Sequence, residues 1–149
     1  MIQRVFHAVT PEQTIAAGEW LGRLLRPGDF VEVSGELGCG KTTFIQGLVR
    51  GYGIDTVVTS PSFALLHVYE AEDRGVVHAD PDRLAGPEDV LSTGLNDYIG
   101  GPMVIAVEWP ERLGNLVPEE HIVVDIHFGE NEARTIVINA PDRFAACGE

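Results

Sequence analysis

Residues 35–42 read Gly-Glu-Leu-Gly-Cys-Gly-Lys-Thr, which matches the phosphate-loop pattern G-x-x-x-x-G-K-[ST]. Lys41 is the only lysine among the 149 residues, and every other formal cation is an arginine. The planar guanidinium of arginine cannot take the place of a compact ammonium at this position. The presence of the only lysine here therefore supports a functional phosphate loop. Glycine makes up about 7% of residues on average, so roughly one chain of this length in a few hundred would match the pattern by chance.

The residues on either side of the pattern place it between a strand and a helix. Residues 30–33 read Phe-Val-Glu-Val, which is typical of a buried strand, and residues 43–50 have the apolar spacing of a helix. Backbone N–H groups of such a turn converge at the start of the helix, where the helix dipole also favours an anion. We expect Lys41 to reach the β- and γ-phosphates of ATP and the Thr42 hydroxyl to coordinate Mg²⁺. The expected nucleotide contacts of this segment are Gly38, Cys39, Gly40, Lys41, Thr42 and Thr43.

Two acidic residues follow apolar runs and are candidates for the second group that a phosphate loop needs. Glu108 comes directly after residues 104–107, and Asp80 follows residues 76–79 with one polar interruption at His78. Such carboxylates commonly end a buried strand beside the loop. We expect Glu108 to serve the metal, and Asp80 to orient the attacking water or to share the metal shell. Each residue is also compatible with a solvated strand end.

Three further features of the sequence bear on the site. The polar segment 59–62 contains Ser62 and predicts a switch loop that senses the γ-phosphate, although such a segment alone is also an ordinary turn. His78, Asp80 and Asp82 alternate along the chain with Pro81 between the acids, an arrangement that suits zinc or iron poorly. Trp109 lies between Glu108 and a proline, where it would contact a partner or nucleotide, or cap the core.

The remaining patterns predict an α/β fold with a single domain over residues 1–149. Thr10 and Pro11 begin a helix that should run to about residue 26, with Gln13 placed to complete a capping box. Strands are expected at residues 63–69, 75–79 and 103–107, and a hairpin at residues 122–128 and 134–139. The predicted architecture is a three-layer fold like that of P-loop nucleoside triphosphatases, with a mostly parallel central sheet and antiparallel C-terminal strands.

Composition limits the classes of function. The formal net charge is −13, which opposes direct docking on a nucleic-acid backbone or on anionic lipid. No apolar run reaches 18 residues and the first residues lack the pattern of a signal peptide, so a cytoplasmic protein is expected. Cys39 lies inside the loop and Cys147 near the last residue, and both are expected to be free thiols because bridging them would block the nucleotide.

Taken in order, these segments resemble the TsaE family of small bacterial ATPases, which act in tRNA threonylcarbamoyladenosine (t6A) synthesis. The resemblance covers nearly the whole chain. Its markers are the loop 35–43, Thr-Ser-Pro-Ser-Phe at 59–63, His-Ala-Asp-Pro-Asp-Arg-Leu at 78–84 and Val-Glu-Trp-Pro-Glu at 107–111. The loop alone is generic, whereas Glu-Trp-Pro-Glu combined with the other segments is specific.

The resemblance implies roles for individual residues. Lys41 and Thr42 would bind nucleotide and Mg²⁺, Glu108 would be the acidic metal partner, and Asp80 would be needed for hydrolysis. Ser62 would belong to the switch loop. Arg134 matches an arginine that the family carries before its C-terminal hairpin, which implies a nucleotide contact. The family acts with the TsaB–TsaD pair, and its ATPase is thought to reset that complex, so tRNA would be met only indirectly and the chain alone would be a monomer.

The chain departs from the family pattern at three places. Cys39 stands where the family has alanine, Ser62 where it has threonine, and residues 81–82 are Pro-Asp where it favours Leu-Tyr.

Two other functions stay open. A small-molecule kinase would share the loop but needs an arginine-rich lid, and residues 84–98 contain no arginine. A nucleotide-gated interaction module without hydrolysis would keep the loop and lack a competent water-positioning group.

Overall fold

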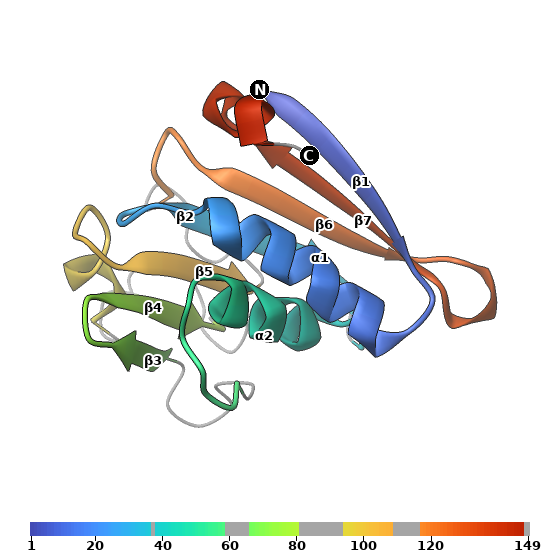
Figure 1. Cartoon of the computed structure of the whole chain (residues 1–149), viewed down its shortest axis with the longest axis horizontal. Coiled ribbons are helices and arrows are strands. Elements are labelled where there is room, and N and C mark those ends of the chain that lie inside the picture. Colours follow the sequence, from blue (N-terminus) through green and yellow to red (C-terminus); the bar gives the residue numbers. More distant parts are fainter. Residues whose placement is uncertain (37, 59–65, 81–93, 109–116, 148–149) are drawn as a thin grey trace.

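Seven strands form one sheet, and two helices cover one of its faces in the computed structural model (Figure 1). The model describes residues 1–36, 38–58, 66–80, 94–108 and 117–147. The strands are β1 (Ile2–Ala8), β2 (Phe30–Gly35), β3 (Leu66–Ala71), β4 (Arg74–Ala79), β5 (Val104–Glu108), β6 (Ile122–Phe128) and β7 (Arg134–Ala140). The helices are α1 (Pro11–Leu24) and α2 (Lys41–Gly51), and shorter 3₁₀ turns are η2 (Leu95–Asp97), η4 (Glu130–Glu132) and η5 (Asp142–Cys147).

The strand order β1-β7-β6-β2-β5-β4-β3 places the loop strand at the centre of the sheet. Strands β4, β5, β2 and β6 are parallel, whereas β3 pairs with β4, and β7 with both β6 and β1, in antiparallel fashion. The predicted α/β class with a parallel centre and antiparallel C-terminal strands is confirmed. Parallel strands end at a common edge, so the segments that follow β2, β4 and β5 leave the sheet close together.

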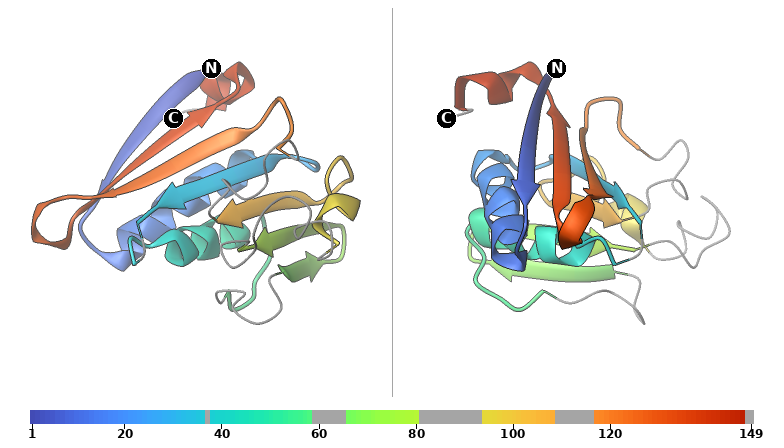
Figure 2. Two further views of the ribbon diagram at one scale, coloured as in Figure 1. Left: turned by 180° about the vertical axis from the view of Figure 1, so that it is seen from behind. Right: turned by 90° about the vertical axis from the view of Figure 1, so that its right-hand side faces the viewer.

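Apolar side chains fill both faces of the sheet. On the helix face, alternate residues of the central strands pack against α1 and α2, as Val33, Val76 and Ala106 do. On the opposite face, Val77 and Ile105 pack with the segment that contains η2. Because side chains alternate along a strand, this division also decides on which face each polar strand residue lies. Figure 2 shows the two helices side by side on one face.

The start of α1 follows the predicted capping chemistry. The Thr10 hydroxyl accepts the Gln13 N–H at 3.2 Å, and Pro11 occupies the first helical position. The Gln13 side chain accepts the Val9 N–H at 2.6 Å, one residue earlier than in a standard capping box. The helix ends at Leu24, two residues before the expected end. Among the described residues, no helix is both long and apolar enough to cross a membrane.

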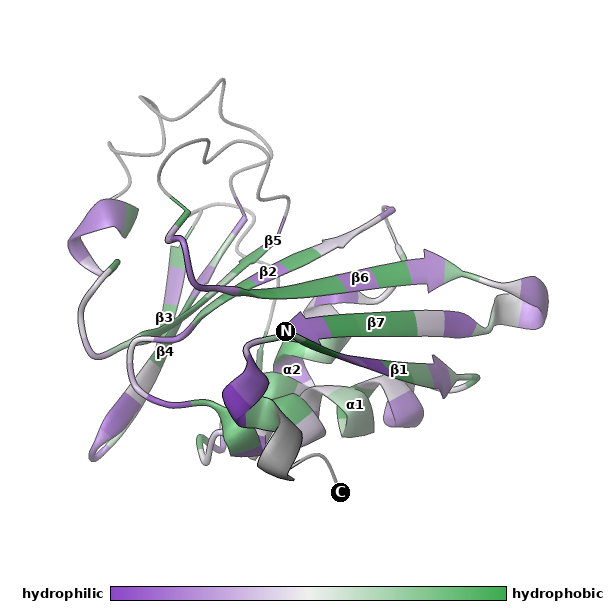
Figure 3. Ribbon diagram, turned by 90° about the horizontal axis from the view of Figure 1, so that it is seen from above, coloured by the Kyte–Doolittle hydropathy of each residue, from purple (hydrophilic) through white to green (hydrophobic). Residues whose placement is uncertain are grey.

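The edges of the sheet differ most from the sequence prediction. Strand β1 was not predicted, because its inward positions include the charged Arg4 while Val5 points outward. The Arg4 guanidinium lies 5.1 Å from the Trp20 ring, so its stem covers apolar surface as an aliphatic residue would. The turn between β3 and β4 is shorter than expected, since Ala71 pairs directly with Arg74. The hairpin of β6 and β7 was predicted correctly, and its hydrophilic tip extends beyond the sheet (Figure 3).

Candidate nucleotide-binding site

The backbone of the glycine-rich turn adopts a conformation that favours glycine. Gly38 has φ of 80° and Gly40 has φ of 105°, both in the left-handed region where residues with a Cβ atom are strained. Helix α2 begins directly after Gly40, whose carbonyl accepts the Phe44 N–H at 2.8 Å. The N–H groups of Lys41, Thr42 and Thr43 therefore have no hydrogen-bond acceptor within the helix, and they point toward the glycine-rich turn. The predicted strand-turn-helix arrangement is confirmed.

Lys41 lies across the mouth of this turn. Its ammonium donates to the carbonyl oxygens of Gly35 at 2.9 Å and Glu36 at 3.1 Å, and the side chain is only 5% exposed. Its charge is thereby held at the end of β2, beside the first turn of α2. A buried ammonium at a helix N-terminus makes this point strongly attractive to an anion.

Thr42, Glu108 and His78 meet on the helix face of the sheet. The Thr42 Oγ1 donates to the Glu108 Oε2 at 3.2 Å, and the His78 Nε2 lies 2.6 Å from the same oxygen. Glu108 is 3% exposed and His78 fully buried, so neither side chain is a solvated strand end. The strand register explains why these side chains meet. His78 pairs with Ala106, and Glu108 lies two residues further along the same strand, so its side chain is on the same face of the sheet.

Asp80 follows β4 directly, at the edge of the sheet where β5 also ends. Ala79 pairs with Val107, so Asp80 and Glu108 leave adjacent parallel strands at the same level. Asp80 is half-buried. The structure thus brings both predicted carboxylates to the edge that holds the loop, and the role of Asp80 in hydrolysis stays a prediction.

Arg134 reaches the turn from the hairpin of β6 and β7. Its Nε donates to the Cys39 carbonyl oxygen at 3.0 Å, and its guanidinium carbon lies 4.3 Å from the centre of the Phe128 ring. In a planar trans peptide the carbonyl and the following N–H point in opposite directions, so this bond fixes where the Gly40 N–H points. The structure shows that Arg134 orients the peptide after Cys39. The expected contact of Arg134 with nucleotide stays a prediction.

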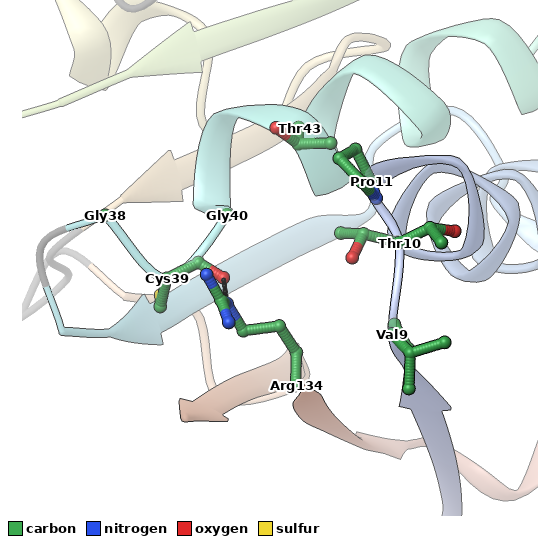
Figure 4. A pocket seen from close by; sticks show the side chains of 10 residues that line it. Val9, Thr10, Pro11, Gly38, Cys39, Gly40, Thr43 and Arg134 are labelled. Carbon is green, nitrogen blue, oxygen red and sulfur yellow. Dashed lines mark hydrogen bonds between the residues drawn. The ribbon is translucent and has the colours of Figure 1, made fainter. Parts of the chain in front are cut away.

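A cavity of about 250 Å³ opens beside the turn. One wall is the turn itself with Thr43 and Arg134, and the other is the junction of β1 and α1 at Val9, Thr10 and Pro11 (Figure 4). Ligand pockets commonly measure roughly 300–1,000 Å³, so this cavity is slightly smaller than a typical site for a whole small-molecule ligand. The sequence had shown Thr10 only as a helix cap, and neither Val9 nor Thr14 carried any signal for this wall.

The Cys39 thiol is fully buried between the loop and the sheet. Burial raises the pKa of this thiol, although the nearby Lys41 ammonium opposes the shift. The thiol is therefore neutral at pH 7 and acts as a small apolar group in the loop. Ser62 and Trp109 lie outside the described residues.

Comparisons with known proteins agree with these features. A family model described as "Threonylcarbamoyl adenosine biosynthesis protein TsaE" matches residues 8–136. The chain is 32% identical over 140 residues to the tRNA threonylcarbamoyladenosine biosynthesis protein TsaE of Bacillus subtilis, covering 94% of this chain and 87% of that protein. It is 35% identical over 127 residues to the protein of the same name from Treponema pallidum, covering 85% of this chain and 93% of that protein.

The fold is shared with a solved structure as well. The crystal structure of YdiB from Bacillus subtilis superposes with a TM-score of 0.81 at 28% sequence identity, covering 99% of this chain and 93% of that chain. The family match spans the loop, both carboxylates and the start of β7. This chain therefore belongs to the TsaE family of t6A biosynthesis proteins.

Proposed function

We propose that the protein binds ATP together with Mg²⁺ at residues 35–42, hydrolyses it slowly, and resets a TsaB–TsaD-type transferase in t6A synthesis. One observation carries the nucleotide part of this proposal. The Thr42 hydroxyl lies 3.2 Å from the buried Glu108 carboxylate at the N-terminus of α2, which also begins with Lys41. Backbone N–H groups, a cation and two oxygen ligands for a metal are thus all supplied at the start of one helix.

The donor set fits magnesium. Hydroxyl and carboxylate oxygens are hard ligands that Mg²⁺ prefers, and a site made from one or two protein oxygens plus substrate phosphates is its usual arrangement. Thr42 and Glu108 would hold the ion. When bound, Mg²⁺ would supply positive charge that offsets the negative charge developing during phosphoryl transfer.

The chain's own groups would divide the remaining work. The N–H groups at the start of α2 and the Lys41 ammonium bind the β- and γ-phosphates, and Arg134 keeps the Cys39–Gly40 peptide oriented for that contact. Asp80 would orient the attacking water from the end of β4. The cavity between the turn and Thr10 would take the nucleoside. Adenine is favoured because a guanine-reading N-K-x-D motif needs a lysine, and the only lysine is Lys41.

A role as an accessory subunit beside other proteins agrees with the charge and the size of this chain. The net charge of −13 disfavours direct tRNA chemistry, because counterion release on a phosphate backbone requires clustered cations. The family description places TsaE in t6A biosynthesis, where TsaB and TsaD are the proposed partners.

The test is Mg²⁺-dependent ATP hydrolysis by the purified chain, alone and with the TsaB–TsaD pair. Lys41→Ala serves as the blank, and Arg23→Ala is the matched control because it removes one positive charge from the exposed side of α1. The expected result is slow turnover that rises with the pair, survives in Arg23→Ala and vanishes in Lys41→Ala. Binding of ATP without turnover in any mixture would instead favour a nucleotide-gated interaction module, and phosphorylation of an added metabolite would favour a kinase.

A further inference from the structure

His78 is a fully buried polar ring whose Nε2 lies against a buried carboxylate. Its Nε2 is 2.6 Å from the Glu108 Oε2, while its Nδ1 has no hydrogen-bond partner among the described residues. A ring that served only to fill space would be better apolar here, because the buried Nδ1 loses its water without gaining a partner. The contact with Glu108 is therefore the feature that distinguishes His78 from a core side chain.

The Glu108 carboxylate receives both of its described hydrogen bonds on one oxygen. Thr42 Oγ1 donates to Oε2 from the first turn of α2, and His78 Nε2 meets the same atom from β4. Within the described part of the chain, Oε1 accepts no bond. Two donors from different elements thus hold the carboxylate in one orientation through a single oxygen.

We propose that His78 is a positioning residue, whose Nε2–H holds the Glu108 carboxylate in the orientation that serves the metal ion. The proposal rests on the Mg²⁺-ATP function proposed above. Hydrogen bonds to a metal-binding carboxylate from outside the coordination sphere commonly change metal affinity or activity by about 10–100-fold when removed. His78 contacts neither metal nor nucleotide in this scheme and acts only through Glu108.

Two neighbouring rings lie beside the His78 imidazole. The Tyr69 and His67 ring centres lie 6.3 Å and 6.5 Å from it, and the His67 Nδ1 bonds the Tyr69 hydroxyl at 3.1 Å. His67 is the direct strand partner of His78. It lies in the same surroundings with its own hydrogen bond, which makes it a matched control.

The first experiment needs neither metal nor nucleotide. A long-range ¹⁵N–¹H correlation spectrum of the histidine-labelled protein should show one ring with a protonated Nε2 and a downfield proton, and this signal should disappear in His78→Gln. The proton should shift in Glu108→Gln and stay unchanged in His67→Phe. A His78 proton that does not respond to Glu108→Gln would overturn the proposed hydrogen bond, whatever the nucleotide chemistry proves to be.

The second experiment measures the affinity for a fluorescent ATP analogue with and without Mg²⁺. His78→Phe keeps a ring and removes the donor, His78→Gln keeps an N–H donor, and His67→Phe is the control. We expect His78→Phe to raise the Mg²⁺ concentration for half-maximal binding about 10-fold or more, with metal-free binding unchanged. His78→Gln should restore most of this loss. If His78→Phe does not fold, as judged by its thermal transition, His78→Leu replaces it.

The outcomes separate the two proposals. If the wild-type protein shows no Mg²⁺-dependent ATP binding, the proposed function fails, while the spectrum still tests the hydrogen bond. If the wild-type protein binds Mg²⁺-ATP and His78→Phe binds it equally well, the positioning role fails alone. Equal impairment of His78→Phe and His78→Gln would also overturn it, because the ring shape and not the donor would then matter.

Discussion

Gly18 of α1 lies against the backbone of Phe44 in α2, so closely that no Cβ atom fits between them. A methyl group at Gly18 would lie 2.8 Å from the Leu48 nitrogen and would overlap the Phe44 carbonyl oxygen. Gly47 of α2 meets the Ile15 backbone in the same way. Helix α2 carries Lys41 and Thr42 at its start, so this helix contact helps to place the site.

Gly18→Ala is therefore expected to destabilise the protein by about 3 kcal/mol, at the upper end of overpacking costs, because backbone atoms cannot rotate away. Urea unfolding measures the change. Gly129→Ala is the matched control, since its Cβ would meet only ordinary contacts, the nearest being the Ala133 oxygen at 3.5 Å. It should leave the free energy of unfolding within about 1 kcal/mol of wild type. Equal effects of the two changes would contradict the close helix packing.

Glu108→Gln should weaken the Mg²⁺ dependence of ATP binding about 10-fold or more, because an amide keeps the shape and loses the charge that attracts the ion. Titration of Mg²⁺ at fixed nucleotide measures this. Binding without the ion should change little, since the proposed phosphate contacts come from Lys41 and the turn. Glu70→Gln removes the same charge at an exposed position of β3 and should behave as wild type. An unchanged magnesium dependence in Glu108→Gln would reject the assignment.

Arg134→Ala should lower the affinity for ATP about 10-fold or more, because the Cys39–Gly40 peptide loses its charged hydrogen-bond donor, a loss of about 1.5–3 kcal/mol. Isothermal titration measures the affinity. Arg4→Ala is the control, since Arg4 also stacks on aromatic rings but lies away from the turn. Phe128→Leu should give a smaller loss of affinity, because it removes only the ring under the guanidinium. Normal affinity in Arg134→Ala would show that the turn holds its shape without this bond.

Cys39 should react slowly with iodoacetamide at pH 7, and its rate should rise with pH. Burial raises the pKa of this thiol, so the reactive thiolate forms at a higher pH than it does in the unfolded chain. The measurement is best made in a Cys147→Ser background, where Cys39 is the only cysteine, with the urea-unfolded chain as reference. The unfolded chain should reach its full rate at lower pH. A folded rate that is already maximal at pH 7 would contradict the raised pKa. ATP should slow the reaction further.

Much of the site could be predicted because its signals are local. One signal is the spacing of glycines before Lys41, and the other is a carboxylate directly after an apolar run. Each depends on a few consecutive residues whose geometry is set by a strand, a turn and a helix start. The hairpin of β6 and β7 was predicted for the same reason, since its alternation and turn lie within one short segment.

Other features depend on which strands become neighbours. The spacing of His78 to Asp80 suits a zinc or iron site poorly and assigned His78 no other role, whereas the structure shows it bonded to Glu108, thirty residues away in sequence. That contact exists only because β4 and β5 are parallel partners with His78 opposite Ala106. Strand β1 was missed because Arg4 faces inward over Trp20, which breaks the apolar alternation that marks a strand.

The sequence by itself determined the α/β class, the phosphate loop with its single lysine, and the two carboxylates at strand ends. Each follows from short-range patterns that a single strand-turn-helix unit expresses wherever it is placed. Only the tertiary structure decided that His78 and Thr42 bond one oxygen of Glu108, that Arg134 orients the loop peptide, and that glycines bring α1 onto α2. These contacts depend on strand register and helix packing, which are properties of the whole sheet and not of any one segment.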